Sequence, residues 1–236
     1  MSAKRARLDR FISQHCQIPR KQVRLILAKG RVSVDGHVVR DADCQIDQFS
    51  QVMLDGQALR QEQPIYLMLH KPVGVVSATK DDEHKTVMDL LPDFQDKGLH
   101  IVGRLDLNTS GLLLLTNDSR WSKRIMSPEH KVAKQYLVTL KAPLTQAYVK
   151  AFAEGFYFAF ENITTQPAQL EILDPHLARV TLHEGRYHQI KRMFGRFRNQ
   201  VMALHRLSVG NLILDETLAV GEYRPLTPLE LASIFG

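Results

Sequence analysis

Residues 103–118 read GRLDLNTSGLLLLTND, the most unusual stretch of this 236-residue chain. A polar loop lies between Gly103 and Gly111, and an apolar run flanks it on each side. Short apolar runs bounded by turn residues indicate strands, and loops held between strands often display catalytic groups. Asp106 is the only carboxylate in the loop and is close to Arg104. The residues alone leave Asp106 three roles: nucleophile, general base or ordinary turn residue.

The composition around this loop is that of a globular protein. Hydrophobic residues make up 44% and charged residues 24% of the chain, which excludes wholesale disorder. No apolar run approaches the roughly 20 residues that a bilayer requires, and the N-terminus lacks the apolar stretch of a secretory signal. Cys16 and Cys44 are too few for a disulfide scaffold. We therefore expect a cytoplasmic protein with no membrane contact.

The positive charge is unevenly distributed along the chain. The net charge of +6 is a weak signal by itself. Residues 1–31, however, hold nine Lys or Arg residues against the single acid Asp9, whereas the remainder of the chain sums to −2. Such an asymmetry between segments predicts a polyanion-binding module joined to a second domain.

The basic segment has the pattern of a small mixed domain. Apolar residues at helical spacing predict two helices, and alternating residues around Asp35-Gly36 predict a β-hairpin. The expected helices cover 7–16 and 19–29, the hairpin strands 31–34 and 37–40, and a further strand 51–54. A polar stretch then runs to Pro64. The predicted organisation is a domain over 1–56, a linker over 57–64 and a second domain over 65–236.

The second domain interleaves strands and helices irregularly, which favours an α+β fold over a doubly wound one. The expected strands are 65–70, 74–78, 99–103, 112–116, 134–140, 168–173, 178–183 and 207–213. The expected helices are 86–91, 119–127, 145–153, 187–197 and 227–235.

The loop around Asp106 resembles the Gly-Arg-Leu-Asp signature of the pseudouridine synthases. Supporting motifs follow in the family's order: HKPVG at 70–74, KQYLV at 134–138 and GRYHQIKRM at 185–193. The late motif GEYRPL at 221–226 is most similar to the RsuA branch, which acts on small-subunit ribosomal RNA. The resemblance implies a mixed, mainly antiparallel sheet in the catalytic domain.

The N-terminal segment resembles the small RNA-binding domain named after ribosomal protein S-four. The matching elements are RLDRFI at 7–12, PRK at 19–21 and GRVSVDG at 30–36. The resemblance implies RNA binding, and the phosphate-contacting residues that we expect are Arg7, Arg10, Arg20, Lys21, Arg24 and Arg31.

The family resemblance also implies the site residues. Asp106 would be the essential nucleophile, Lys191 its basic partner and Tyr136 the aromatic residue against the target base, while Leu204 would line the pocket. Arg192 is expected to point at phosphate, although the reverse assignment of Lys191 and Arg192 stays open. Arg104 and Arg186 are expected to bind RNA. The segment from Arg186 to Arg206 holds six cations and no acid, which favours further contacts with the RNA backbone.

The implied reaction is the isomerisation of a uridine to pseudouridine in 16S ribosomal RNA, by a monomer that meets ribosomal RNA or a ribosomal subunit assembly intermediate. The net chemistry requires no cofactor and no metal. His183-Glu184 and His188 resemble a zinc motif, but the spacing is one residue too long and Gly185 would break the helix. Two alternatives stay open: a large-subunit, 23S target, and a non-catalytic RNA-binding ribosome-assembly protein.

Overall fold

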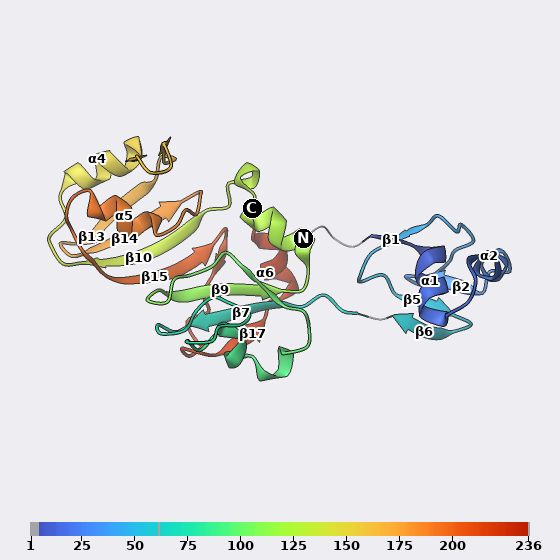
Figure 1. The fold of residues 1–236 in the computed structure, drawn as a ribbon. Coiled ribbons are helices and arrows are strands. Elements are labelled where there is room, and N and C mark those ends of the chain that lie inside the picture. The colour runs from blue at the N-terminus through green and yellow to red at the C-terminus, as the bar shows by residue number, and fades with distance from the viewer. Residues whose placement is uncertain (1–4, 61, 236) are drawn as a thin grey trace. The chain divides into compact units, whose positions relative to one another are not determined.

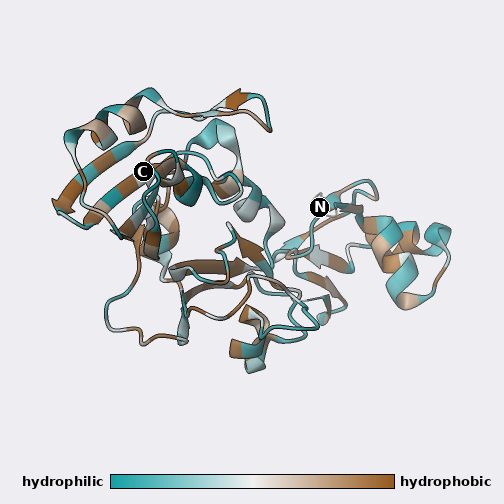
Figure 2. Cartoon of the chain, turned by 60° about the vertical axis from the view of Figure 1, so that its left-hand side comes forward, coloured by the Kyte–Doolittle hydropathy of each residue, from teal (hydrophilic) through white to brown (hydrophobic). Residues whose placement is uncertain are grey.

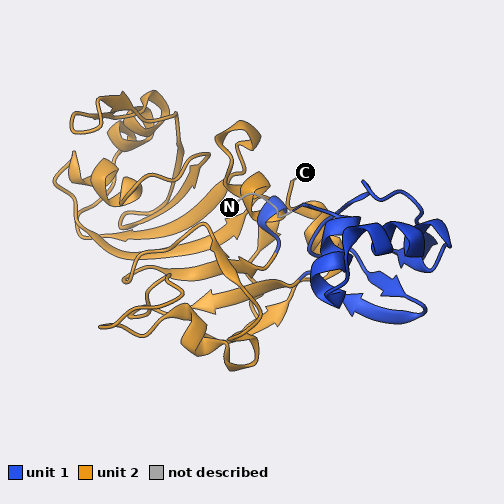
Figure 3. Ribbon diagram, turned by 45° about the vertical axis from the view of Figure 1, so that its right-hand side comes forward, with its two compact units in different colours: residues 1–64, 118–120 blue, residues 65–117, 121–236 orange. Residues whose placement is uncertain are grey.

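The computed structural model describes residues 5–60 and 62–235, and the chain divides into two compact units (Figures 1 and 3). The smaller unit ends at Pro64 and also takes in residues 118–120. The larger unit therefore begins at Ile65, where the sequence predicts the second domain to begin.

The smaller unit contains two helices and two small sheets. The helices have the predicted positions, α1 (Leu8–Cys16) and α2 (Arg20–Ala28). Strands β1 (Ala6–Arg7) and β4 (Gln45–Ile46) form one sheet. The other has the order β3-β2-β5-β6, with β2 (Val32–Val34), β3 (His37–Val38), β5 (Val52–Leu54) and β6 (Gln57–Arg60).

Apolar residues at helical spacing hold this unit together. Leu8 and Ile12 of α1 pack with Val23 and Leu27 of α2, and all four are fully buried. Removing such side chains from water stabilises a small domain by about 1.5–3 kcal/mol each. Most exposed positions of both helices are polar or basic, as the spacing predicts, but Leu25 of α2 is also exposed.

The predicted linker over 57–64 is wrong in its first half, because Gln57–Arg60 form strand β6 against β5. The turn between them is Asp55-Gly56, with φ of 51° and 80°. Asp35-Gly36 has the same backbone, with φ of 50° and 81°. Positive φ at both central residues is the signature of a tight hairpin turn, so the second Asp-Gly pair carried the missing signal.

The larger unit is built on a nine-stranded sheet. Its order is β13-β14-β10-β15-β9-β7-β17, with β8 beside β9 and β16 beside β15. The strands are β7 (Tyr66–Lys71), β8 (His100–Val102), β9 (Ser110–Thr116), β10 (Lys134–Leu140), β13 (Gln169–Asp174), β14 (Leu177–Leu182), β15 (Val201–Val209), β16 (Leu212–Ile213) and β17 (Tyr223–Pro225). Strands β11 (Tyr157–Phe158) and β12 (Ile163–Thr164) pair separately. The expected α+β class, with a mainly antiparallel sheet, is confirmed.

Strand β9 lies inside the sheet and is buried on both faces. Leu112 and Leu114 pack into one hydrophobic cluster, whereas Leu113 and Leu115 pack into another on the opposite side. Successive side chains of a strand point to opposite faces, so a run of four leucines fits a strand covered on both sides. Figure 2 shows central strands of this sheet in the colour of hydrophobic residues.

The pairing of β9 with β15 is parallel, whereas the other strand pairs of the described residues are antiparallel. Strand β15 begins six residues before the predicted start at 207, and the chain turns at Gly210 into β16. Residues 74–78, predicted as a strand, make only an isolated bridge between Val76 and Thr86. Gly74, with φ of 83°, bends the chain there.

The helices of the larger unit lie close to their predicted ranges. Helices α4 and α5 pack on the half of the sheet formed by β13, β14 and β10 (Figure 1). The α-helices are α3 (Ser119–Met126), α4 (Gln146–Glu154), α5 (Gln189–Gly195) and α6 (Pro228–Ser233). The short 3₁₀ turns are η1 (Val87–Leu90), η2 (Pro92–Phe94) and η3 (Pro128–His130).

Candidate active site

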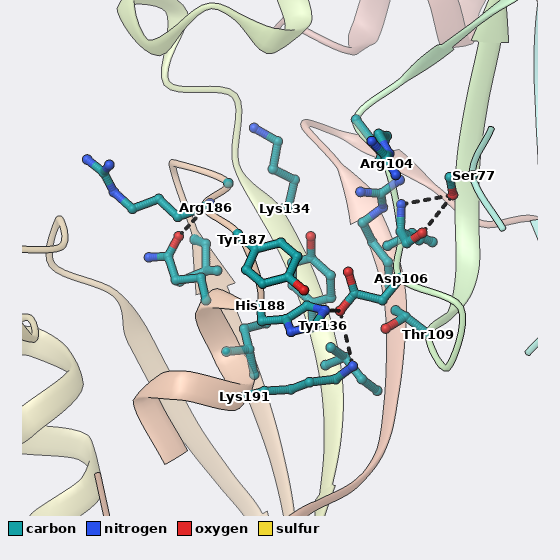
Figure 4. A pocket seen from close by; sticks show the side chains of 18 of the residues that line it. Ser77, Arg104, Asp106, Thr109, Lys134, Tyr136, Arg186, Tyr187, His188 and Lys191 are labelled. Atoms are coloured by element: carbon teal, nitrogen blue, oxygen red, sulfur yellow. Dashed lines mark hydrogen bonds and ion pairs between the residues drawn. The ribbon is translucent and has the colours of Figure 1, made fainter. Parts of the chain in front are cut away.

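The loop between β8 and β9 carries Asp106 and is held by a buried lysine (Figure 4). The Lys71 Nζ atom donates hydrogen bonds to the carbonyl oxygens of Asp106 at 3.1 Å, Thr109 at 2.8 Å and Pro72 at 2.8 Å. Burial lowers the pKa of Lys71 to about 8, and the nearby positive charge of Arg206 acts in the same direction. Lys71 thus fixes the backbone of the loop rather than facing the solvent.

A second buried cation binds the backbone at both ends of the loop. Arg206 of β15 donates from Nε to the carbonyl of Leu112 and from Nη2 to the carbonyl of Gly103, each at 2.8 Å. Its side chain is only 2% exposed. The RNA contact that the basic segment 186–206 favours therefore does not extend to Arg206, whose guanidinium binds the backbone of the Asp106 loop.

The Asp106 carboxylate meets two basic groups that come from the same end of α5. The Lys191 Nζ atom lies 3.1 Å from Asp106 Oδ2, and His188 Nε2 lies 3.3 Å from that same oxygen. Asp106 remains about one-third exposed, at 32%. A carboxylate that is partly exposed and contacts a lysine is both accessible and positioned, which suits a nucleophile or a base.

The structure shows that Lys191, and not the adjacent Arg192, contacts Asp106. Arg192 turns away from Asp106 and binds both oxygens of Glu161, at 2.6 and 2.7 Å. Its guanidinium also lies 3.7 Å over the Phe158 ring. Arg192 does not line the cavity described below, so the structure separates it from the other predicted site residues.

A cavity of about 630 Å³ opens beside Asp106. Tyr136 of β10 and Leu204 of β15 form part of its wall, on two strands that are hydrogen-bonded to each other. Ser77 fixes another part, because its Oγ donates to the Leu105 carbonyl at 2.7 Å and accepts from the Leu105 amide at 3.1 Å. Cavities of this size hold small organic ligands, and one nucleotide fits the range.

Two of the three predicted RNA-binding arginines of this unit lie at the cavity with exposed side chains, whereas the third, Arg192, does not line it. Arg104 and Arg186 both line it (Figure 4). The Arg186 Nε atom binds Glu184 at 2.9 Å. A polyanion that enters the cavity therefore meets guanidinium groups on two different loops.

The predicted RNA-binding residues of the smaller unit fall into two sets. Arg7 and Arg20 both bind the buried carboxylate of Asp9, at 3.0 and 2.6 Å, and Arg31 binds Asp55. Burial alone would raise the pKa of Asp9, but the two guanidinium hydrogen bonds outweigh burial and lower it to about 2. The second set is exposed and consists of Arg10, Lys21 and Arg24. Three of the six predicted RNA-binding cations of this unit therefore already have carboxylate partners, and the other three are exposed.

Within residues 5–60 and 62–235, no group of three or more His, Cys, Asp or Glu side chains could hold a metal ion. Over the same described residues, no helix is long and apolar enough to cross a membrane.

Three contributors to the site were missed as individual residues. Lys71 had been noted only as part of a motif, Arg206 only as one of six cations, and His188 only as a rejected zinc ligand. The predicted helix over 187–197 would have placed His188 and Lys191, three residues apart, on the same side. In the structure His188 instead precedes α5 with a left-handed backbone, and it still reaches Asp106.

The comparisons with known proteins agree over nearly the whole chain. Residues 65–195 match the family described as RNA pseudouridylate synthase. The chain is 50% identical over 229 residues to "Ribosomal small subunit pseudouridine synthase A" of Pseudomonas aeruginosa, covering 97% of this chain and 100% of the relative. The Escherichia coli K12 protein of the same name is 44% identical, with 97% and 99% covered. A crystal structure of a pseudouridylate synthase, 42% identical, superposes with a TM-score of 0.70 over 97% of this chain and 99% of that chain.

Proposed function

The chain belongs to the RNA pseudouridylate synthase family, and we propose that it isomerises a specific uridine of 16S, small-subunit ribosomal RNA to pseudouridine. The observation that carries the proposal is the Asp106 carboxylate, held at the edge of a nucleotide-sized cavity with Lys191 on one oxygen. The names of the relatives from Pseudomonas aeruginosa and Escherichia coli support the small-subunit target.

The reaction breaks the N1–C1′ bond of the uridine and forms a C5–C1′ bond after the base has rotated. The C5 proton leaves and N1 gains a proton, so nothing is oxidised or lost. We assign Asp106 the role of nucleophile and Lys191 that of its cationic partner, which contacts the Oδ2 atom. Tyr136 stacks on the uracil, and its hydroxyl assists removal of the C5 proton.

The cations at the cavity would hold the RNA so that the target nucleotide can enter the cavity. Neither C1′ nor C5 can be reached while a base is stacked in a helix, so the target nucleotide must be turned out into the cavity. We propose that Arg104 and Arg186 bind the backbone next to that nucleotide. Arg10, Lys21 and Arg24 of the smaller unit would bind more distant phosphates of the same folded RNA, which is the role of an S-four-like domain.

An Asp106→Asn variant tests the assignment of the nucleophile. The amide keeps the shape of the carboxylate but has no negative charge, so we expect pseudouridine formation to stop while RNA affinity changes little. Asp82→Asn, which changes an exposed aspartate outside the cavity, is the matched control. Product at the wild-type rate from Asp106→Asn would refute the role.

The target is tested by mapping pseudouridines in ribosomal RNA from cells with and without this protein. We expect one small-subunit position to lose its modification. A loss in large-subunit RNA would replace the 16S target by the 23S one, and no loss in either would favour the non-catalytic ribosome-assembly protein. We further propose a cytoplasmic monomer, for which size-exclusion chromatography with light scattering checks the oligomeric state.

A further inference from the structure

His188 contacts the same carboxylate oxygen as Lys191. His188 Nε2 lies 3.3 Å and Lys191 Nζ 3.1 Å from Asp106 Oδ2, and Figure 4 shows both reaching it from one side. Within the described part of the chain, Asp106 Oδ1 takes part in no hydrogen bond or ion pair. The two oxygens of Asp106 therefore have different surroundings.

We propose that His188 is a positioning residue which, with Lys191, fixes the Asp106 carboxylate through Oδ2 and leaves Oδ1 free to face the target uridine. The inference rests on the proposed function, because it assigns a task to a residue beside the proposed nucleophile. Lys191 contacts Oδ2 through a flexible side chain, and His188 contacts the same oxygen from a second position. Two contacts restrain the carboxylate more than one flexible lysine can.

The conformation of His188 supports a functional position. Its φ of 48° lies in the left-handed region, and it directly precedes α5. Such a backbone is unfavourable for an L-residue other than Asn or Asp, and residues held in this region cluster at active sites. The conformation turns the imidazole back toward the β8–β9 loop, where Asp106 lies.

A stacked neighbour limits the rotation of the imidazole. The Tyr187 and His188 rings are 3.9 Å apart with an interplanar angle of 19°, and Tyr187 is 76% exposed. The hydrophobic core therefore does not hold this ring pair. The backbone on one side and Tyr187 on the other fix the direction in which Nε2 points.

Fixing one carboxylate oxygen matters because the reaction needs the other at a defined angle to the sugar or the base. A misplacement of about 1 Å near a reacting atom costs about 100-fold in rate. The carboxylate can turn about its Cβ–Cγ bond, and two contacts on Oδ2 resist that turn more than one. Loss of His188 should therefore lower kcat and leave the KM for RNA nearly unchanged.

Three substitutions at His188 test separately the hydrogen-bond donor to Asp106 and the aromatic ring that stacks on Tyr187. His188→Gln keeps an N–H donor at the distance of Nε2 but removes the ring, whereas His188→Phe keeps a ring for Tyr187 and removes the donor. His188→Asn suits the left-handed backbone but carries its amide one bond too short to reach Oδ2. The assay is single-turnover pseudouridine formation on small-subunit RNA, with RNA affinity and the melting temperature measured for each full-length variant.

We expect kcat to fall about tenfold or more in the Phe and Asn variants, to recover to within about threefold in the Gln variant, and KM to stay constant. Wild-type kcat in the Phe or Asn variant overturns the inference, as does a Gln variant slower than Phe. If the Phe variant does not fold, the comparison of Asn with Gln decides. Asp106→Asn is assayed in parallel, so that a failure of the proposed function can be told from a failure of this inference. Activity of Asp106→Asn would refute the nucleophile role of Asp106. Wild-type rates of the His188 variants, with an inactive Asp106→Asn, would refute only the positioning role of His188.

Discussion

Gly111 lies so close to the backbone of Arg206 that no other residue fits. A β-carbon at Gly111 would lie 2.3 Å from the Arg206 carbonyl oxygen and 2.5 Å from its amide nitrogen. The two residues are paired in the parallel contact of β9 with β15, and Gly111 has a φ of 108°. This close approach brings Arg206 within reach of both ends of the Asp106 loop.

Gly111→Ala should therefore destabilise the protein strongly. The added methyl group meets backbone atoms, which cannot move away without separating two sheet strands, and the φ is unfavourable for alanine. We expect the free energy of unfolding to fall by roughly 3 kcal/mol or more in urea denaturation. Gly195→Ala is the control, because a β-carbon there meets nothing within 4 Å. Equal stability of the two variants would contradict the argument.

Lys71 should make stability depend on pH in the alkaline range. Its pKa is lowered from 10.5 to about 8 in the folded state, so between these values the unfolded chain binds more protons. The free energy of unfolding of the wild type, relative to Lys71→Met, should rise from pH 8 to 10.5 by up to about 3 kcal/mol. Denaturation series of both proteins at several pH values measure this difference. A constant difference would show that the lysine is not held in a lowered-pKa state.

Lys191 and Arg192 are adjacent cations with different partners, which makes them matched variants. Lys191→Met removes the cation that contacts Asp106 Oδ2, and we expect kcat to fall about 100-fold, because the proposed nucleophile loses a contact that positions it. Arg192→Met releases Glu161 instead and should change kcat less than about threefold. Single-turnover assays compare them. A larger loss in the Arg192 variant would reverse the assignment.

The exposed cations of the smaller unit should govern the salt dependence of RNA binding. Replacing Arg10, Lys21 and Arg24 by Gln removes three candidate phosphate contacts, so the slope of log affinity against log salt should become shallower by about 2 to 3. The control replaces Lys80, Lys97 and Lys150, which are exposed lysines of the larger unit that do not line the cavity. Fluorescence anisotropy at several salt concentrations measures both slopes, and equal slopes would exclude an electrostatic role for this set.

The sequence predicts most accurately those elements whose signal is local. Strand β10 has the predicted bounds, 134–140, and α1 and α2 lie within one residue of theirs. The Asp35-Gly36 hairpin forms because its turn residues adopt positive φ with little cost. In each case a short window of residues contains the information that selects the structure.

Elements that depend on distant partners were predicted less well. The early part of β15 lacks alternation, and its neighbour β9 precedes it by more than 90 residues. Strand β17 is short, contains Pro225 and pairs at the edge of the sheet, where proline is tolerated. Neither pattern is visible in a local window, because tertiary contacts select these strands.

The same distinction applies to the candidate site. The loop sequence made Asp106 a candidate, and the family resemblance predicted its role together with those of Tyr136 and Lys191. The choice of Lys191 over Arg192 required the direction of α5, and the roles of Lys71 and Arg206 required three-dimensional contacts with backbone carbonyls. The composition shows only that Lys71 and Arg206 are cations. Their burial and their hydrogen bonds to backbone carbonyls show that they hold the loop.

The parallel pairing of β9 with β15 joins two segments that are far apart in the sequence, and the site can form only after the second of them has been synthesised. The Asp106 loop leaves the ribosome about 100 residues before Arg206, and Lys191 follows the loop by 85 residues. A nascent chain therefore carries Asp106 and the earlier contacts from Lys71 and Ser77 long before it carries Lys191 and Arg206. Every truncation before residue 206 leaves the Asp106 loop without the two hydrogen bonds that Arg206 donates to its ends.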